Sequence, residues 1–346
     1  MKAFRRYLLY RLEGSVLRSA IFTILSVIIT QSVISECIDD YEIQYNETGI
    51  YMLAVVLGII CTLIPILELS GFKNRRNLDT LYFFPIKREK MAAAHFVSGF
   101  LQVIVIYSIT FFTAYGYLSA NTDYFALQYM MLYYVLSILL GFVMYSVFSF
   151  LFIQANTVAD GVLFCILWIF VLSLIGYNIQ NEIVIPLMTE ENEVFRGDGL
   201  LSEWGIIYAP INNLTVIFQD LIEVNKIRGY YYYSYADVYR EQAYMFFAWG
   251  AVGIASAVGY FVTFVKRGAE KVGEISDSFF GFRTLIPVYG YMLLMFIGTG
   301  EPILTVLIFA MMVIGYIIYR RGFRFKTSDL VLTGCGILAV ILGNLT

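Results

Sequence analysis

The sequence holds few residues whose types and spacing could do chemistry. His95 is the single histidine, and the four cysteines have no metal-ligand spacing, so neither a zinc site nor a disulfide framework is indicated. A covalent catalyst needs a nucleophile beside a base, and no G-x-S-x-G or H-E-x-x-H motif occurs. No G-x-x-x-x-G-K-S/T phosphate loop is present either. We therefore expect no catalytic residue, metal ligand or cofactor site in this chain, and a structural role for His95.

The amino-acid composition indicates whether the chain folds in water or in a membrane. Hydrophobic residues make up 60% of the 346 positions and charged residues 14%, and the mean hydropathy is +0.74. Soluble domains have about 45–50% apolar and about 25% charged residues, so a soluble fold is excluded, as are disordered, collagen-like and coiled-coil chains. A net charge of −3 gives no indication of a nucleic-acid partner. We predict an all-α polytopic membrane protein.

Nine stretches are apolar enough to be membrane helices, which need about 20 such residues. They lie at 19–35, 50–67, 92–117, 125–153, 158–177, 243–265, 285–299, 303–319 and 330–345. The last three are short and could all cross, form a hairpin plus one crossing, or be partly re-entrant. Asp160 is the only charged residue within the nine, which disfavours a proton-driven secondary transporter. Gln31 and Gln102 are expected to bond between helices.

The basic residues predict the orientation in the membrane. Of 23 Lys and Arg residues, 19 fall in the segments 1–18, 69–91, 266–283 and 320–326, which share one side if the spans alternate. The segment 36–49 holds five acids and no base. By the positive-inside rule the N-terminus is cytoplasmic, and 36–49, 118–124 and 178–242 are outside. We expect a multi-pass protein of the cell membrane.

The connections between the spans divide the chain into four parts. Phe4, Leu8, Leu12 and Val16 recur every four residues, so 1–18 is expected to be an amphipathic elbow helix in the membrane interface. The remaining parts are a six-span core at 19–265 with an inner loop at 69–91 and an outer loop at 178–242, a linker at 266–283, and two to three C-terminal membrane helices within 284–346.

One span carries a pattern for close helix packing. Ala251, Ala255 and Gly259 form a ridge of small residues in 243–265, which is expected to pack against another helix of the same subunit.

Two inner segments have the properties of docking surfaces. Asn77 can cap a short helix, Leu78, Leu81 and Tyr82 share one face of it, and Pro85 ends it. The tight turn 154–160, which contains Asn156, is polar and nearly free of charge. A helix with an apolar face between basic flanks suits a groove on a soluble partner.

Two motifs at these places resemble those of a known family. Asp79-Thr80-Leu81-Tyr82-Phe83-Phe84-Pro85-Ile86-Lys87-Arg88 is similar to the D-x-L-x-x-L-P-I-x-R element that follows span two in permease subunits of ABC-2-type exporters, with Phe84 in place of the commoner Leu. The stretch 266–274 is similar to their basic R-x-x-E-x-x-G element after span six. The C-terminal spans resemble a Gram-positive subgroup that includes permeases of amphipathic-peptide toxin exporters.

The resemblance implies the type V ABC transporter fold and a set of partners. Two permease copies, alike or different, would each couple to a separate ABC ATPase subunit that binds MgATP, through Asn77, Leu78, Asp79, Leu81, Tyr82, Phe83, Pro85, Arg88 and Asn156. In the family, spans two and five line the translocation pathway. The corresponding residues here are Ile60, Leu63, Ile64, Phe164, Trp168 and Leu172. An apolar lining suits a hydrophobic or amphipathic substrate, with a peptide favoured.

Other functional classes stay open at this point. A membrane interaction or scaffold protein without transport would have no ATPase partner. A secondary transporter is disfavoured by the nearly charge-free spans, and an intramembrane enzyme by the single imidazole.

Overall fold

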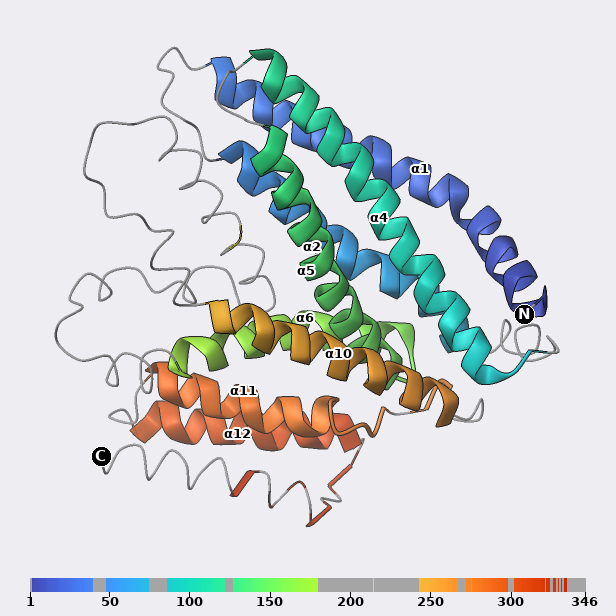
Figure 1. The fold of residues 1–346 in the computed structure, drawn as a ribbon. Helices are drawn as coiled ribbons and strands as arrows, with labels where there is room; N and C mark the ends of the chain where they lie inside the picture. The colour runs from blue at the N-terminus through green and yellow to red at the C-terminus, as the bar shows by residue number, and fades with distance from the viewer. Residues whose placement is uncertain are drawn as a thin grey trace. The chain divides into compact units, whose positions relative to one another are not determined.

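The structure is a computed structural model in which the described residues form helices and no strands. It describes 2–39, 48–74, 86–121, 127–179, 214, 243–266, 272–274, 276–297, 302–320 and single positions between 322 and 334. The helices are α1 (Lys2–Asp39), α2 (Thr48–Leu69), η1 (Ser70–Lys73), α4 (Arg88–Asn121), α5 (Leu127–Gln154), α6 (Val158–Ile179), α10 (Ala243–Lys266), α11 (Phe282–Ile297) and α12 (Pro302–Arg320) (Figure 1).

The membrane character of the chain follows from these helices. Five of them contain segments long and apolar enough to cross a bilayer, at Phe4–Ser35, Tyr51–Lys73, Arg88–Asn121, Leu127–Gln154 and Trp249–Lys266. Val158–Ile169 and Val306–Arg320 are shorter apolar helices. The prediction of an all-helical, multi-pass membrane protein is therefore confirmed for the described residues. The ninth predicted span, 330–345, lies almost wholly outside them.

The first helix does not divide into an elbow and a span. Residues 2–39 form one helix, α1, with no break near residue 18. Its side facing the protein carries Tyr7, Ser15 and the half-buried Arg11 and Arg18, whereas Val16 is exposed. The segment 1–18 thus packs against other helices through a polar stripe, while the apolar positions of the predicted elbow are half-buried at Phe4, Leu8 and Leu12 and exposed at Val16.

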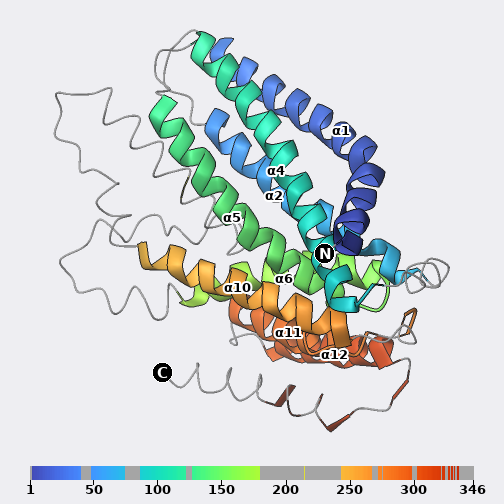
Figure 2. The ribbon, with the colours of Figure 1, turned by 45° about the vertical axis from the view of Figure 1, so that its right-hand side comes forward.

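The helices form two compact units, of which the first contains α1, α2, α4, α5 and α10. Figures 1 and 2 both show α1 and α4 side by side along most of their lengths. Ser26 and Thr110 share a hydrogen bond between their hydroxyl oxygens at 2.7 Å, and Gln31 Nε2 donates to the Thr113 carbonyl at 3.0 Å. The prediction that Gln31 bonds between helices is confirmed. Such bonds substitute for water in an apolar surrounding.

Close approach of α4 and α5 depends on one glycine. A Cβ atom at Gly99 would lie 2.2 Å from the Tyr145 hydroxyl, and Tyr145 itself is 1% exposed. Real Cβ contacts are never that short, so only glycine fits here while Tyr145 keeps its place. The aromatic rings of Phe96, Phe100 and Tyr145 fill the space around this contact.

The packing face of α10 differs from the predicted one. Ala251 and Ala255 are exposed, whereas Gly253 and Tyr260 are buried. A Cβ at Gly253 would lie 2.8 Å from Val143 Cγ2, and one at Gly259 2.7 Å from Phe150 Cε2. The predicted ridge is thus wrong for intrachain packing at its two alanines, because the large neighbours on α5 face the glycines instead.

The second unit contains α6, α11 and α12. Phe164 of α6 and Leu285 of α11 are buried together, and the rings of Phe164 and Phe282 meet edge to face with centroids 5.0 Å apart. Leu294, Ile308 and Met312 form the buried contact between α11 and α12. The predicted six-span core grouped residues 158–177 with the preceding spans, whereas in the structure α6 packs against the C-terminal helices.

Candidate functional site

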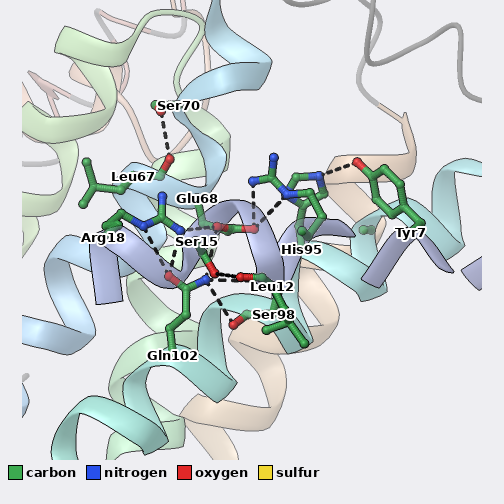
Figure 3. Close-up of polar contacts among 12 residues, drawn as sticks. Tyr7, Leu12, Ser15, Arg18, Leu67, Glu68, Ser70, His95, Ser98 and Gln102 are labelled. Atoms are coloured by element: carbon green, nitrogen blue, oxygen red, sulfur yellow. Dashed lines mark hydrogen bonds and ion pairs between the residues drawn. The ribbon is translucent and has the colours of Figure 1, made fainter. Parts of the chain in front are cut away.

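A buried carboxylate at the end of α2 is the centre of a polar cluster in the first unit. The side chain of Glu68 is 0% exposed. The sequence pattern ended the second span at residue 67, but α2 continues through Glu68 to Leu69 and then tightens into η1. Figure 3 shows that Arg18, His95 and Gln102 converge on this carboxylate from the neighbouring helices.

Two arginines of α1 bind the two carboxylate oxygens of Glu68. Arg11 donates from Nη2 at 2.9 Å and from Nε at 3.3 Å to Oε1, and Arg18 donates from Nη2 at 2.6 Å to Oε2. The two arginines are seven residues apart with Ser15 between them, a spacing that places all three on one face of a helix. The continuity of α1 through residue 18 is therefore what positions both guanidinium groups.

Helix α4 supplies the remaining polar groups. The Gln102 side-chain oxygen accepts from Arg18 Nη2 at 2.7 Å, and its Nε2 donates to Glu68 Oε2 at 3.4 Å and to the Ser98 carbonyl at 3.2 Å. His95 Nε2 and the Tyr7 hydroxyl are 2.9 Å apart, and His95 Nδ1 lies 3.2 Å from Glu68 Oε1. We name Arg11, Arg18, Glu68, His95 and Gln102 the Glu68 cluster.

The cluster combines burial with an uneven charge. With His95 as a neutral imidazole, two guanidinium groups face one carboxylate, which leaves one positive charge in excess. Removing one partner of a buried ion pair strands the other, at a cost of about 3–5 kcal/mol. The cluster therefore joins α1, the end of α2 and the first turns of α4 into one unit. The predictions that Gln102 bonds between helices and that His95 has a structural role are both in agreement with this geometry.

A pocket of about 290 Å³ opens beside the cluster. Arg11, Arg18, Glu68 and His95 line it, together with residues of η1. Each arginine side chain is 25% exposed, whereas Glu68 is closed off. The pocket therefore presents the cationic members of the cluster and hides the anionic one.

The inner turn 154–160 is held by the segment that precedes α11. The backbone N–H of Asn156 donates to Ser276 Oγ at 2.7 Å, and Ser276 Oγ donates to Asp160 Oδ2 at 2.6 Å. The Gly273 N–H donates to the Asn156 carbonyl at 3.2 Å. Gly273 has a φ of 82°, which favours glycine at this position. The backbone of Asn156, a predicted ATPase-coupling residue, is thus engaged within its own chain.

Ion pairs join the ends of α11 and α12 in the same unit. Arg320 donates from Nη2 to Asp329 Oδ1 at 2.9 Å and from Nε to Asp329 Oδ2 at 3.0 Å. Lys326 donates to Asp277 Oδ2 at 2.7 Å, and this hydrogen bond lowers the pKa of the Asp277 carboxyl below its ordinary value. Since Asp329 is 1% exposed, these contacts stabilise the helix ends.

Most of the predicted coupling residues fall outside the described part of the chain. The described residues stop at Asn74 and resume at Ile86, so nothing is stated of Asn77, Leu78, Asp79, Leu81, Tyr82, Phe83 and Pro85. Arg88 is the first residue of α4, and its predicted contact with an ATPase stays a prediction.

The predicted pathway residues divide between buried and exposed positions. On α2, Ile60 and Ile64 are buried inside the first unit, whereas Leu63 is exposed. On α6, Phe164 is buried against α11 and Trp168 Nε1 donates to the Phe280 carbonyl at 2.7 Å. The side chain of Leu172 lies outside the described residues. A pathway between two copies is tested by none of these placements and stays a prediction.

The Glu68 cluster is the feature that sequence reasoning missed. A hydropathy window ends where charge begins, so the predicted span stops at residue 67 and Glu68 falls just outside it. A signal was present in the spacing of polar residues. Arg11, Ser15 and Arg18 recur at one helical face, and His95, Ser98 and Gln102 do so on the third span. Two matching polar stripes on apolar helices indicate a shared buried partner.

The chain matches no family model, no curated protein and no solved structure with which it was compared. Within the described ranges no group of three or more His, Cys, Asp or Glu side chains could hold a metal ion. What the Glu68 cluster can do chemically is to lock helices together and to present positive charge to the pocket.

Proposed function

We propose that this chain is the transmembrane permease subunit of an ATP-driven exporter, energised by a separate ABC ATPase. Its substrate would be hydrophobic or amphipathic, with a peptide favoured. Two copies, alike or different, would form the pathway in the cell membrane, and MgATP would bind only to the partner subunit. The chain has several membrane helices and no phosphate loop of its own, so an external source of energy is consistent with its sequence.

The observation that carries the proposal is the position of the Glu68 cluster. It ties the end of α2 to the first turns of α4, and the segment 75–85, which contains most of the motif that resembles a coupling element, connects those two helices in the sequence. A partner that pushes on this segment would move α2, α4 and α1 together, because breaking the buried ion pairs is costly. Transmission of force to several membrane helices is what a coupling element requires.

The test is the double substitution Leu81→Ala and Tyr82→Ala. Truncating two anchors of a docking helix costs about 2 kcal/mol or more of binding free energy. We expect the variant to reach the membrane and to lose the ATPase, or to keep an ATPase that hydrolyses ATP without export. Photolabelling with an azido-ATP analogue after purification from native membranes measures the ATPase that copurifies.

Leu9→Ala with Val16→Ala is the control, since it truncates two exposed apolar side chains of α1 that do not line the pocket beside the Glu68 cluster. Wild-type ATPase recovery with Leu81→Ala and Tyr82→Ala would reject the docking role of 77–84. If wild-type protein copurifies with no ATP-binding subunit, the alternative of a membrane scaffold replaces the transporter.

One observation favours a secondary transporter as the second candidate. The argument against it was the scarcity of charge in the spans, yet Glu68 and His95 are buried within the segments Tyr51–Lys73 and Arg88–Asn121. Buried ionisable residues in membrane helices often belong to proton pathways. Transport that continues in ATP-free vesicles and stops when a protonophore is added would favour this candidate over an ATP-driven exporter.

A further inference from the structure

The pocket beside the Glu68 cluster contains hydrogen-bond donors that take no part in holding the helices together. All hydrogen bonds of Arg11 and Arg18 come from Nε and Nη2, and neither Nη1 group has a partner among the described residues. Each Nη1 carries two N–H donors. Both side chains line the pocket and are partly exposed there. Two guanidinium edges therefore remain available to one acceptor.

The charge of the site selects an anion. One carboxylate balances one guanidinium, and the second guanidinium has no counter-charge within the cluster. Glu68 also lines the pocket, but its side chain is 0% exposed and both of its oxygens accept hydrogen bonds from the arginines, which offset its charge. Guanidinium groups with free N–H donors bind phosphate oxygens well, because several bonds of suitable geometry form at once.

Exposed apolar side chains lie in and beside the pocket. Tyr10 is 60% exposed and Leu67 37% exposed, and both line the pocket. Leu17, next to Arg18, is 74% exposed on a helix apolar enough to cross a bilayer. A cationic centre beside exposed apolar side chains matches an amphiphile with an anionic head and acyl chains. A volume of about 290 Å³ suits the headgroup only, since pockets for whole drug-sized ligands measure about 300–1,000 Å³.

We propose that this pocket binds the phosphate-bearing headgroup of an anionic phospholipid, with the Nη1 groups of Arg11 and Arg18 as donors. The lipid neutralises the excess charge of the cluster, and its acyl chains lie along the exposed apolar surface of α1. This binding requires neither an ATPase nor transport, so it stands or falls separately from the function proposed above.

The experiment measures lipid binding to the full chain in detergent. Native mass spectrometry gives the apparent affinity for phosphatidylglycerol and for zwitterionic phosphatidylcholine. The triple variant Arg11→Gln, Arg18→Gln, Glu68→Gln removes both arginines and the carboxylate together, so no charged side chain of the ion pairs is left without a partner. We expect it to bind phosphatidylglycerol roughly tenfold more weakly than wild type, the effect of losing charge-assisted hydrogen bonds. Wild-type affinity in the triple variant would overturn the proposal.

A matched control separates this pocket from general attraction by basic residues. Arg5 and Arg6 lie near the same end of α1, are exposed and do not line the pocket, so Arg5→Gln with Arg6→Gln removes the same number of arginines outside it. We expect this variant to keep its affinity within twofold. An equal loss in both variants would mean that surface charge, and not the pocket, attracts the lipid.

Two further measurements, a photocrosslinking experiment and a phosphate titration, complete the test. If the triple variant does not fold, phosphatidylglycerol with a photoreactive headgroup is crosslinked to wild-type protein, and the label is expected in residues 10–18 and 67–72. A label confined to other peptides contradicts the proposal. Inorganic phosphate is titrated as the alternative source of the same chemistry. Thermal stabilisation by phosphate, with no added effect of phosphatidylglycerol, would show that the site takes the free anion and not the lipid.

Discussion

Arg18 Nη2 and Glu68 Oε2 lie 2.6 Å apart, although the two residues are 50 positions apart in sequence. The bond joins the middle of α1 to the last turn of α2, and Gln102 of α4 contacts both partners. Three apolar helices are thus held together by polar groups at one level. In an apolar surrounding, packing alone gives helices little preference for one register, and buried hydrogen bonds supply it.

The first prediction concerns this ion pair. Glu68→Gln removes the only carboxylate of the cluster and leaves two half-buried guanidinium groups without a counter-charge. We expect unfolding free energy to fall by about 3–5 kcal/mol, the usual cost of stranding a buried charge. Arg18→Gln is expected to cost less, because Arg11 still pairs with the carboxylate.

A double-mutant cycle checks the prediction. Thermal unfolding in detergent is measured for wild type, both single variants and the double variant Arg18→Gln, Glu68→Gln. We expect the double variant to be more stable than the sum of the single effects implies. Additive effects would mean that Arg18 and Glu68 do not interact in the folded protein.

The helices themselves could be predicted from the sequence, whereas the cluster could not. Long apolar runs such as 92–117 specify membrane helices whatever their neighbours are, because the backbone must satisfy its own hydrogen bonds in lipid. The partners of Arg11, Arg18 and Glu68 depend on how α1, α2 and α4 are placed in three dimensions. Hydropathy treats each of these residues as loop charge, since it averages along the chain and ignores the face on which a residue lies.

The same reason explains the two corrections. Residue 18 marks a change in composition, yet no proline or other helix-breaking signal follows it, so α1 continues. Small residues occur on two faces of α10, and the sequence alone does not say which one meets α5. Val143 and Phe150 decide it, because they occupy the space opposite Gly253 and Gly259.

The second prediction concerns Gly99. Gly99→Ala would place a methyl group 2.2 Å from the Tyr145 hydroxyl, so one of the two must move. We expect a loss of about 1–3 kcal/mol, as for other overpacked cores. Gly116→Ala on the same helix is the control, because nothing lies within 4 Å of its Cβ position. It is expected to be neutral or to gain up to about 1 kcal/mol from helix propensity.

Tyr145→Phe tests the cause of that loss. The atom nearest to the added methyl group is the hydroxyl oxygen, while the ring carbon behind it is 3.1 Å away. Tyr145→Phe should therefore restore part of the stability of Gly99→Ala when thermal unfolding of the two is compared. No restoration would show that α4 and α5 do not approach each other through this contact.

The third prediction concerns the face of α10. Gly253→Ala is expected to destabilise the protein by about 1–3 kcal/mol, since a Cβ there would lie 3.0 Å from the Val143 backbone, which cannot turn away. Gly250→Ala is the control on the same helix, with nothing within 4 Å. Ala255→Leu should leave thermal stability in detergent unchanged, because Ala255 is exposed. A large loss with Ala255→Leu and none with Gly253→Ala would mean that α10 is rotated.

The last prediction concerns orientation, which rests on the sorting of 19 of 23 basic residues to one side. In a background with Cys37→Ser and Cys335→Ser, the remaining Cys61 and Cys165 are buried free thiols. Gln44→Cys and Glu190→Cys are expected to react with a membrane-impermeant maleimide on intact cells. Arg75→Cys and Lys271→Cys should react only after the cells are opened, because positively charged loops stay on the cytoplasmic side. Labelling of Arg75→Cys on intact cells would reverse the orientation and move the segment 77–84 away from any cytoplasmic ATPase.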